Sequence, residues 1–354
     1  MFDGPETGPM KQANPSIAFA ALALLLVLSG LDQTILSTAL PTIVGELGGR
    51  DLAPWAFTAY LLASTAVIPL YGSLADRQGP RPVLLCSVAL FAAGSLACAL
   101  AGSLPALVAA RALQGLGGGG LMTLTMLATA ALFPLPERGR RMGALGAAYG
   151  LATLVGPLAG ALLLEVLPWQ WAFWINLPGA LLALAVLWRA ELGQPQARDT
   201  RPDWLGAALL AASLTALLLA LREGLWLLAG LSAVLAAAWW QVERRAADPV
   251  VPLSLFQRRP FVAAAALATL SGTLLFASVV FVPLFLQQGL KLSPVSAALA
   301  TLPLMLGITV GGQLAGRALR GGQSARRLGR WAAVGLKLGR SEEHTSELQS
   351  QSTI

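Results

Sequence analysis

The sequence is poor in charged residues. Asp, Glu, Lys and Arg together make up only 12% of the 354 residues, whereas hydrophobic residues make up 56%. Soluble globular domains carry about 25% charged residues, so this composition excludes an ordinary water-soluble domain. It indicates a chain whose helices lie mostly in lipid or against one another.

Histidine and cysteine are nearly absent. The single histidine is His344, in the polar C-terminal segment, and the two cysteines, Cys86 and Cys98, share one apolar run. The apolar part of the chain therefore has no histidine to serve as a general base or a metal ligand. The cysteines would lie about 18 Å apart along a helix and cannot form a disulfide with each other. We expect no enzyme activity, metal site or cofactor from such a sequence.

The sequence consists mainly of long apolar runs. Ten runs are long enough to cross a bilayer, and they are continuous and rich in Ala, Leu and Gly. We predict helices because only a helix satisfies its own backbone polar groups in lipid within one segment. The fold class is therefore an all-α integral membrane protein. The runs cover residues 17–40, 54–74, 83–103, 106–132, 142–164, 172–188, 204–221, 225–242, 261–286 and 294–315.

The basic residues predict an orientation. They gather in the N-terminal segment and in every second connection, while the opposite connections hold only Arg50, Arg222 and Lys291. Because cytoplasmic loops accumulate Lys and Arg, we predict a cytoplasmic N-terminus. The basic composition then reflects topology, and no nucleic-acid partner is expected. The polar N-terminus does not resemble a cleaved signal, so the first run is expected to stay as an anchor.

One carboxylate lies deep in the first apolar run. Asp32 stands well inside both ends of residues 17–40. Charge in the lipid interior is costly, so an ionisable residue there indicates a functional site. The alternative is a protonated or hydrogen-bonded carboxyl that only holds helices together.

A motif follows the second run. The segment from Gly72 to Pro82 reads GSLADRQGPRP. A glycine at 72 allows close helix approach, a glycine at 79 allows a tight turn, and the aspartate can pair with a nearby arginine or a helix end. The segment resembles the signature loop of the major facilitator superfamily, which implies a latch between two halves on the cytoplasmic side; an ordinary charged turn is the alternative. The matching residues are Gly72, Asp76, Arg77, Gly79 and Arg81.

A buried arginine opens the fourth run. By helical rise, Arg111 lies about 9 Å and Asp32 about 13 Å from the outer end, so the two can meet if their helices are neighbours. The segment containing Arg111, Gln114, Gly115 and Gly117 resembles the superfamily's fourth-span motif, whose arginine is implicated in proton coupling. The glycines from 117 to 120 leave a helix face almost without side chains, which suits tight packing.

The fifth run carries a proline between glycines. Gly156, Pro157 and Gly160 resemble the antiporter motif of drug exporters, although Ala152 and Ala161 stand where glycines are usual. The proline removes a helical hydrogen bond and favours a kink, and the glycines allow another helix to approach. A kink without bearing on transport direction is the alternative.

Two further segments indicate which branch of the superfamily the chain resembles. WQWAFWINLPG at residues 169–179 and DWLGAALL from Asp203 resemble the fourteen-span drug:proton antiporters, and the aromatic residues of the first segment suit a membrane interface. Those antiporters insert two helices between two six-helix halves. The resemblance implies a cytoplasmic segment at 1–16, an N-terminal bundle at 17–188, two extra helices at 189–260 and the start of a C-terminal bundle at 261–339.

The last part of the chain changes character. The sequence at 316–322 echoes the Gly72 motif, and 331–338 is similar to the start of an eleventh span. Residues 340–354 are polar, and residues 340–350 resemble translated sequencing adapter, so we expect a non-native tail at 340–354 after a truncated second half. A disordered polar tail is the alternative.

The resemblance implies a secondary transporter that exports small amphipathic or cationic compounds in exchange for protons. Asp32 would titrate and Arg111 would modulate its protonation, with the proton gradient as the energy source and no cofactor. The expected partners are a small-molecule substrate, protons and the lipid bilayer of the cell membrane, and the protein is expected to be a monomer. Candidate cavity-lining residues are Gln33, Thr34, Tyr60 and Asn176.

Three alternatives stay open. The first is that the chain is an inactive fragment of such a transporter. The second is that the transporter exports one specific metabolite. The third is a membrane-embedded enzyme or channel. This third alternative is disfavoured because paired intramembrane carboxylates, a Cys/His cluster and a repeated filter-like loop are absent from the sequence.

Overall fold

The computed structural model describes residues 14–190, 192, 203–246, 249, 251 and 253–292, together with a few single positions between 296 and 311. Every regular element in this part of the chain is helical. The elements are α1 (Pro15–Leu47), η1 (Arg50–Leu52), α2 (Trp55–Gln78), α3 (Pro80–Ala99), α4 (Leu104–Leu132), α5 (Leu135–Val166), α6 (Trp171–Trp174), α7 (Asn176–Trp188), α8 (Trp204–Glu223), α9 (Trp226–Glu243), η2 (Leu253–Gln257) and α10 (Arg259–Gln288).

The helices follow the apolar runs. Each of the first nine predicted runs falls on one helix or, for 172–188, on the consecutive α6 and α7. The predicted outer end of the first run at residue 40 was too early, because α1 continues through Pro41 to Leu47 and ends at Gly48, whose φ is 71°. The tenth run, the motif echo at 316–322, the start of an eleventh span and the tail lie wholly or almost wholly outside the described residues.

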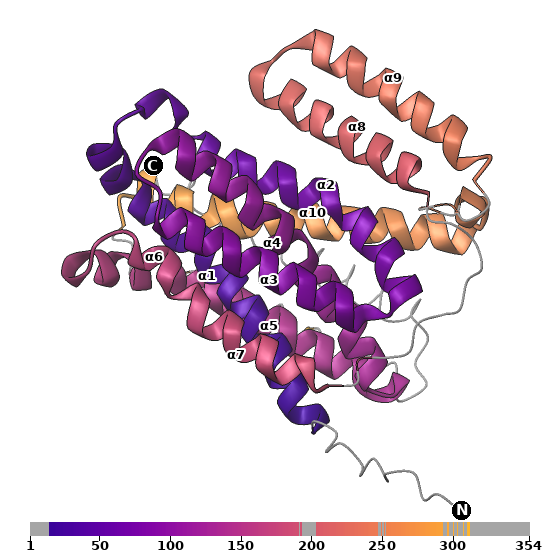
Figure 1. Cartoon of the computed structure of the whole chain (residues 1–354), viewed down its shortest axis with the longest axis horizontal. Coiled ribbons are helices and arrows are strands. Elements are labelled where there is room, and N and C mark those ends of the chain that lie inside the picture. The colour runs from indigo at the N-terminus through magenta and orange to yellow at the C-terminus, as the bar shows by residue number, and fades with distance from the viewer. Residues whose placement is uncertain are drawn as a thin grey trace, which may run out of the picture.

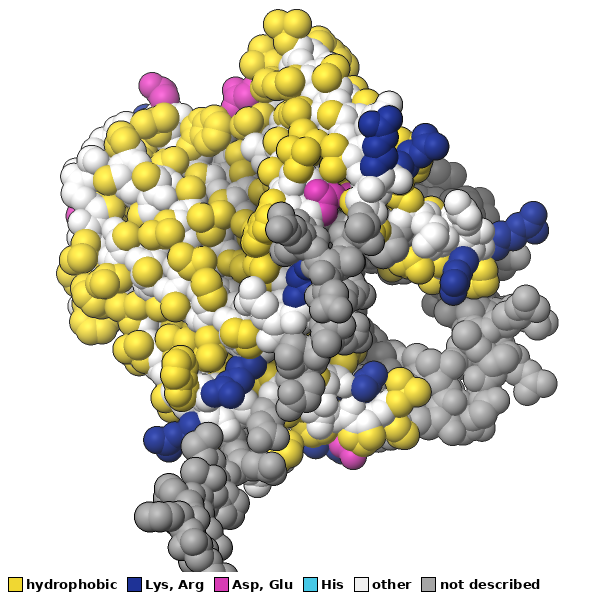
Figure 2. Space-filling view, turned by 45° about the vertical axis from the view of Figure 1, so that its right-hand side comes forward, with side chains coloured by type: hydrophobic (Ala, Val, Ile, Leu, Met, Phe, Trp, Pro, Cys, Tyr) yellow, Lys and Arg dark blue, Asp and Glu magenta, His cyan; other side chains and the backbone are white. Residues whose placement is uncertain are grey.

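The described helices have the dimensions of membrane spans. Seven helical segments are long and apolar enough to cross a bilayer, and α5, bent by 41° near residue 154, makes an eighth. In Figure 2 hydrophobic and uncharged side chains cover most of the left-hand part of the molecule, and most Lys and Arg side chains appear along the lower and right-hand sides. This separation of an apolar surface from basic residues is what a bilayer requires.

Helices α1 to α7 form a bundle (Figure 1), in which α4 and α1 each contact several of the other helices. Helix α4 packs between α2 and α3, and α1 packs against α5 and α7. Helices α1 and α4 also contact each other, and α3 contacts α7. The bundle therefore brings α1, α3, α4 and α7 together.

The core has two hydrophobic clusters. One contains Leu25 and Phe91, and the other contains Ile35 and Phe173. Along α1 the first cluster ends at Leu28 and the second begins at Ile35, with buried Asp32 between them. A polar layer thus lies at mid-depth between two apolar layers.

Helices α8 and α9 form a separate hairpin. In Figure 1 the hairpin stands beside the bundle at the upper right, and α8 contacts α2. The two helices are joined by reciprocal hydrogen bonds in which Ser232 Oγ donates to Ser213 O at 2.9 Å and Ser213 Oγ to Ser232 O at 3.3 Å. The predicted boundaries of the two extra helices, after residue 188 and after residue 260, stay a prediction.

Candidate functional site

Glycines allow α4 to approach two helices at once. A Cβ on Gly115 would lie 2.5 Å from the carbonyl oxygen of Tyr60 on α2, and one on Gly117 would lie 2.1 Å from the backbone nitrogen of Phe91 on α3. Contacts this short exclude any side chain larger than hydrogen. The close packing of α4 places the polar residues at its start within reach of α1, α2 and α3.

Asp32 and Arg111 form an ion pair inside the bundle. Arg111 Nη1 lies 2.6 Å from Asp32 Oδ2, and both side chains are fully buried. Arg111 Nε also donates to the carbonyl oxygen of Ala56 at 3.1 Å, and its guanidinium lies 4.4 Å from the centre of the Tyr60 ring. The arginine is thus held by a carboxylate, a backbone carbonyl and an aromatic face, each of which favours a cation.

Three more buried side chains complete the network. Gln114 Nε2 donates to Asp32 Oδ1 at 2.7 Å, and Asn176 Nδ2 donates to the same oxygen at 2.8 Å. Both amides also donate to Ser95 Oγ, at 2.8 and 3.3 Å. The carbonyl oxygen of Gln114 accepts from Arg111 at 2.5 Å. The carboxylate therefore links α1 directly to α4 and α7, and the two amides extend the network to Ser95 on α3.

The hydrogen bonds to Asp32 suit its ionised form. Every group within hydrogen-bond distance of Asp32 in the described structure is a donor. A protonated carboxyl would need an acceptor for its own O–H, so this arrangement suits the ionised carboxylate. Two buried polar atoms, Arg111 Nη2 and Asn176 Oδ1, have no hydrogen-bond partner among the described residues.

The loop residues lie away from this network. Gly79 has a φ of 81° and joins α2 to α3, as expected for a tight turn. Arg81 donates to the backbone oxygen of Trp188 at the end of α7. Asp76 is exposed and makes no ion pair with a described residue, and a Cβ on Gly72 would meet no described atom within 4 Å. The expected pairing of Asp76 with Arg77 or Arg81 and the close approach at Gly72 are therefore not made in the described part of the chain.

The fifth-span motif packs against α1. The bend in α5 falls between Thr153 and Val155, and Pro157 has no N–H to bond the carbonyl of Thr153, four residues earlier. A Cβ on Gly156 would lie 1.8 Å from Thr34 Oγ1, and one on Gly160 would lie 2.2 Å from Thr38 Oγ1. The kink and the two glycines therefore shape the α1–α5 contact.

The candidate cavity residues have other positions in this conformation. Tyr60 is 4% exposed and Asn176 is fully buried, so both belong to the network and neither lines an open cavity. Thr34 Oγ1 donates to Gly30 O at 2.9 Å and faces α5. Gln33 is half-buried, and its Nε2 has no partner among the described residues.

Sequence reasoning missed Ser95 and the inward direction of Trp169. Ser95 is fully buried, but a serine in an apolar run carries no signal of its direction. The aromatic residues after α5 were assigned to the membrane interface, yet Trp169 is 1% exposed and Phe173 packs edge-on against it. Trp169 turns inward because its indole N–H donates to Glu46 at 2.8 Å, near the end of α1.

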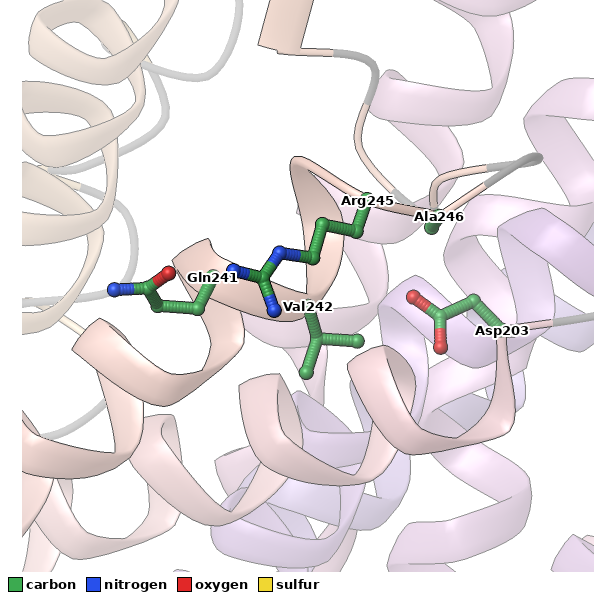
Figure 3. A pocket seen from close by; sticks show the side chains of 5 residues that line it. All are labelled: Asp203, Gln241, Val242, Arg245 and Ala246. Atoms are coloured by element: carbon green, nitrogen blue, oxygen red, sulfur yellow. The ribbon is translucent and has the colours of Figure 1, made fainter.

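A pocket lies at the base of the α8–α9 hairpin (Figure 3). It has a volume of about 310 Å³, and Asp203 enters it from the start of α8. Asp203 Oδ1 accepts from the backbone N–H of Gly206 at 2.8 Å, so its first role is to cap α8. No residue of the Asp32 network lines this pocket. Its lining residues are Asp203, Gln241, Val242, Arg245 and Ala246.

Comparison with known proteins finds relatives among membrane exporters. The chain is 34% identical over 321 residues to multidrug resistance protein 3 of Bacillus subtilis, which covers 88% of this chain and 63% of the relative. It is 35% identical over 326 residues to the MFS-type efflux pump LUC4 of a Fusarium species, covering 87% and 58%. The chain therefore spans less than two thirds of the length of these relatives.

Solved structures support the same fold. The crystal structure of the human organic anion transporter MFSD10 superposes with a TM-score of 0.58 at 19% identity, over 86% of this chain and 73% of that one. The family model of the Major Facilitator Superfamily matches residues 22–339, nearly the whole chain. The chain therefore belongs to the major facilitator superfamily.

Proposed function

We propose that this chain is part of a transporter that exports small amphipathic or cationic compounds in exchange for protons. Asp32 binds the proton, and Arg111 is its counter-ion. The observation that carries the proposal is the fully buried contact of 2.6 Å between them, surrounded by polar side chains at mid-depth of the bundle. An ionisable pair in this position is expensive and marks a proton or ion pathway more often than a structural role.

The pair can exist in two states with different contacts. When Asp32 is ionised it holds Arg111, Gln114 and Asn176 together across α1, α4 and α7. Protonation removes the negative charge that balances the guanidinium, so the contact between α1 and α4 weakens. A proton can therefore shift the balance between two helix arrangements, which is what coupling requires.

The relatives support the kind of substrate. Their names describe a multidrug resistance protein and an efflux pump. The distribution of Lys and Arg supports a cell-membrane protein with a cytoplasmic N-terminus. We take it to work as a monomer, with the proton gradient as its energy source and without a cofactor.

The test is dye efflux from energised cells. Cells would express the chain or the complete gene amplified from genomic DNA, each as wild type and as Asp32→Asn, with and without a protonophore. Asp32→Asn keeps the side-chain size and removes the titratable proton. We expect wild-type efflux to collapse with the protonophore and to be at least tenfold lower in the variant. Efflux by the complete gene that persists in Asp32→Asn would demote Asp32 to a structural carboxyl.

A further inference from the structure

Asn176 has an unusual place in the polar network. It begins α7, is fully buried and donates through Nδ2 to Asp32 Oδ1 at 2.8 Å and to Ser95 Oγ at 3.3 Å. Its own carbonyl oxygen has no hydrogen-bond partner among the described residues. Buried polar atoms are almost always paired, so an unpaired one calls for an explanation.

Gln114 gives the comparison that singles out Asn176. Both amides donate to Asp32 Oδ1. The carbonyl oxygen of Gln114 is occupied, because it accepts from Arg111 Nη1 at 2.5 Å and from Cys98 Sγ at 3.6 Å. Turning the Gln114 amide would break those contacts. Turning the Asn176 amide breaks no hydrogen bond at its oxygen, because that oxygen has no partner among the described residues. Asn176 is therefore the amide beside Asp32 that can reverse its direction.

We propose that Asn176 responds to the protonation of Asp32 by reversing its amide, donating to the carboxylate and accepting from the carboxylic acid. This inference rests on the proposed proton binding at Asp32. A proton from solvent forms an O–H bond on Asp32 Oδ1, the oxygen away from the guanidinium. The Nδ2–H···Oδ1 hydrogen bond is lost, and half a turn about the Cβ–Cγ bond of Asn176 lets its oxygen accept the new O–H.

Ser95 allows both orientations. A serine hydroxyl is a donor and an acceptor, so Ser95 Oγ can accept from the amide of Asn176 before the turn and donate to its oxygen afterwards. The start of α7 thus keeps its hydrogen bonds in both charge states of Asp32. Asn176 acts as a positioning residue that connects α7 to the charge of α1.

Few other groups can produce the same response. The titratable or charged side chains facing Asp32 are Arg111 on α4, Tyr60 on α2 and Cys98 on α3, and Tyr149 on α5 lies near Tyr60. The described residues of α7 include none. Arginine, tyrosine and cysteine do not change charge in the acidic range, so Asp32 is the one carboxyl among these facing groups.

The sequence permits a selective measurement, because Asn14 and Asn176 are its only asparagines. Asn14 caps α1 by accepting from the N–H of Ser16, and Asn14→Ser keeps a capping side chain. In this variant, asparagine labelled with ¹³C at the side-chain carbonyl reports Asn176 alone. The experiment is an infrared pH titration of the labelled protein in lipid vesicles, with Asp32→Asn to identify the carboxylic acid band.

The expected result is a shift of two bands together. As pH falls, the acid band of Asp32 appears, and the Asn176 carbonyl band moves to lower frequency with the same midpoint, because the oxygen gains a strong donor. Without a turn, the same carbonyl would stay unpaired and its band would stay or rise. An acid band that appears while the Asn176 band stays or rises overturns the inference and leaves proton binding at Asp32 intact. The absence of any Asp32 acid band overturns both.

Substitution gives an independent check. Asn176→Leu has a similar size but neither donor nor acceptor, so the Asp32 acid band should move to higher frequency because its O–H loses the Asn176 acceptor. Thr129→Val on α4 is the matched control, since Thr129 is fully buried and its hydroxyl donates to Thr125 O within its own helix, outside the Asp32 network. The control should keep the frequency of the acid band. Equal spectra for Asn176→Leu and wild type would contradict the inference.

Discussion

At the scale of single residues, one carboxylate organises the polar layer. Asp32 accepts from Arg111, Gln114 and Asn176, and all four side chains are buried. A buried ion pair adds little net stability compared with apolar residues, but removing one partner is costly because the other charge remains unpaired. The network therefore specifies how the helices meet more than it stabilises the bundle.

This asymmetry predicts the behaviour of Arg111 variants. Arg111→Ala should lower the free energy of unfolding by about 3 kcal/mol at pH 8. The wild-type protein at the same pH is the reference. The double variant Asp32→Asn, Arg111→Gln should recover more than half of the loss. Unfolding of the purified protein in detergent measures all three, and equal losses in the single and double variants would contradict an unpaired charge as the cause.

At the scale of elements, glycine decides which helices touch. On α4, Gly115 faces α2 and Gly117 faces α3 at distances that exclude a Cβ. The backbone oxygens exposed between these contacts are also used, since Tyr71 donates to Leu116 O at 2.7 Å and Ser87 to Gly117 O at 2.6 Å. Helices in lipid associate through such close contacts and hydrogen bonds, because lipid gives little hydrophobic drive.

A methyl group on α4 tests this packing. Gly117→Ala places a Cβ 2.1 Å from the backbone of Phe91, and overpacking of this kind costs about 1–3 kcal/mol. Gly143→Ala on α5 is the control, because its Cβ would meet no described atom within 4 Å. Thermal unfolding should show a loss for Gly117→Ala and no loss for Gly143→Ala. A similar change in both would point to backbone entropy and away from packing.

The α1–α5 contact allows a rescue experiment. Gly156→Ala would bring a Cβ to 1.8 Å from Thr34 Oγ1, and that hydroxyl is held in place by its bond to Gly30 O. We expect a loss of about 1–3 kcal/mol. Adding Thr34→Ala removes the nearer clashing atom, Oγ1, and leaves Thr34 Cβ at 2.7 Å, so it should restore part of the stability, as measured by thermal unfolding. Failure of the second substitution to rescue would mean that the helices meet differently.

At the scale of the whole molecule, two hydrophobic clusters enclose a thin polar layer. Residues of several helices contribute to each layer, so the charge state of Asp32 affects how these helices pack. The surface is sorted as well, with an apolar face and basic residues along other sides in Figure 2. Such sorting favours one orientation in the membrane.

Labelling of single cysteines tests that orientation. In a chain carrying Cys86→Ser and Cys98→Ala, a new cysteine is placed either at Asp51, between α1 and α2, or at Gly139, in the exposed first turns of α5. With a membrane-impermeant maleimide on intact cells, Asp51→Cys should react, and Gly139→Cys should react only after permeabilisation. The reverse pattern would place the N-terminus outside.

The sequence by itself determined the class of fold and the heights of the main residues. Hydropathy is a local property, and the rise of a helix is constant, so run lengths predicted the helices and placed Asp32 and Arg111 at similar depths. That the two cysteines are free also follows from their spacing, whereas the exposure of Cys86 and the burial of Cys98 come from the structure.

The tertiary structure decided which side chains meet at those heights. Ser95 and Asn176 join Asp32 only because α3 and α7 pack beside α1 with particular rotations, and Trp169 turns inward because Glu46 lies across from it. Close approach occurs at Gly117 and not, within the described residues, at Gly72. A sequence records the distance of a residue along its helix, whereas its neighbours depend on the rotation and packing of helices far apart in the chain.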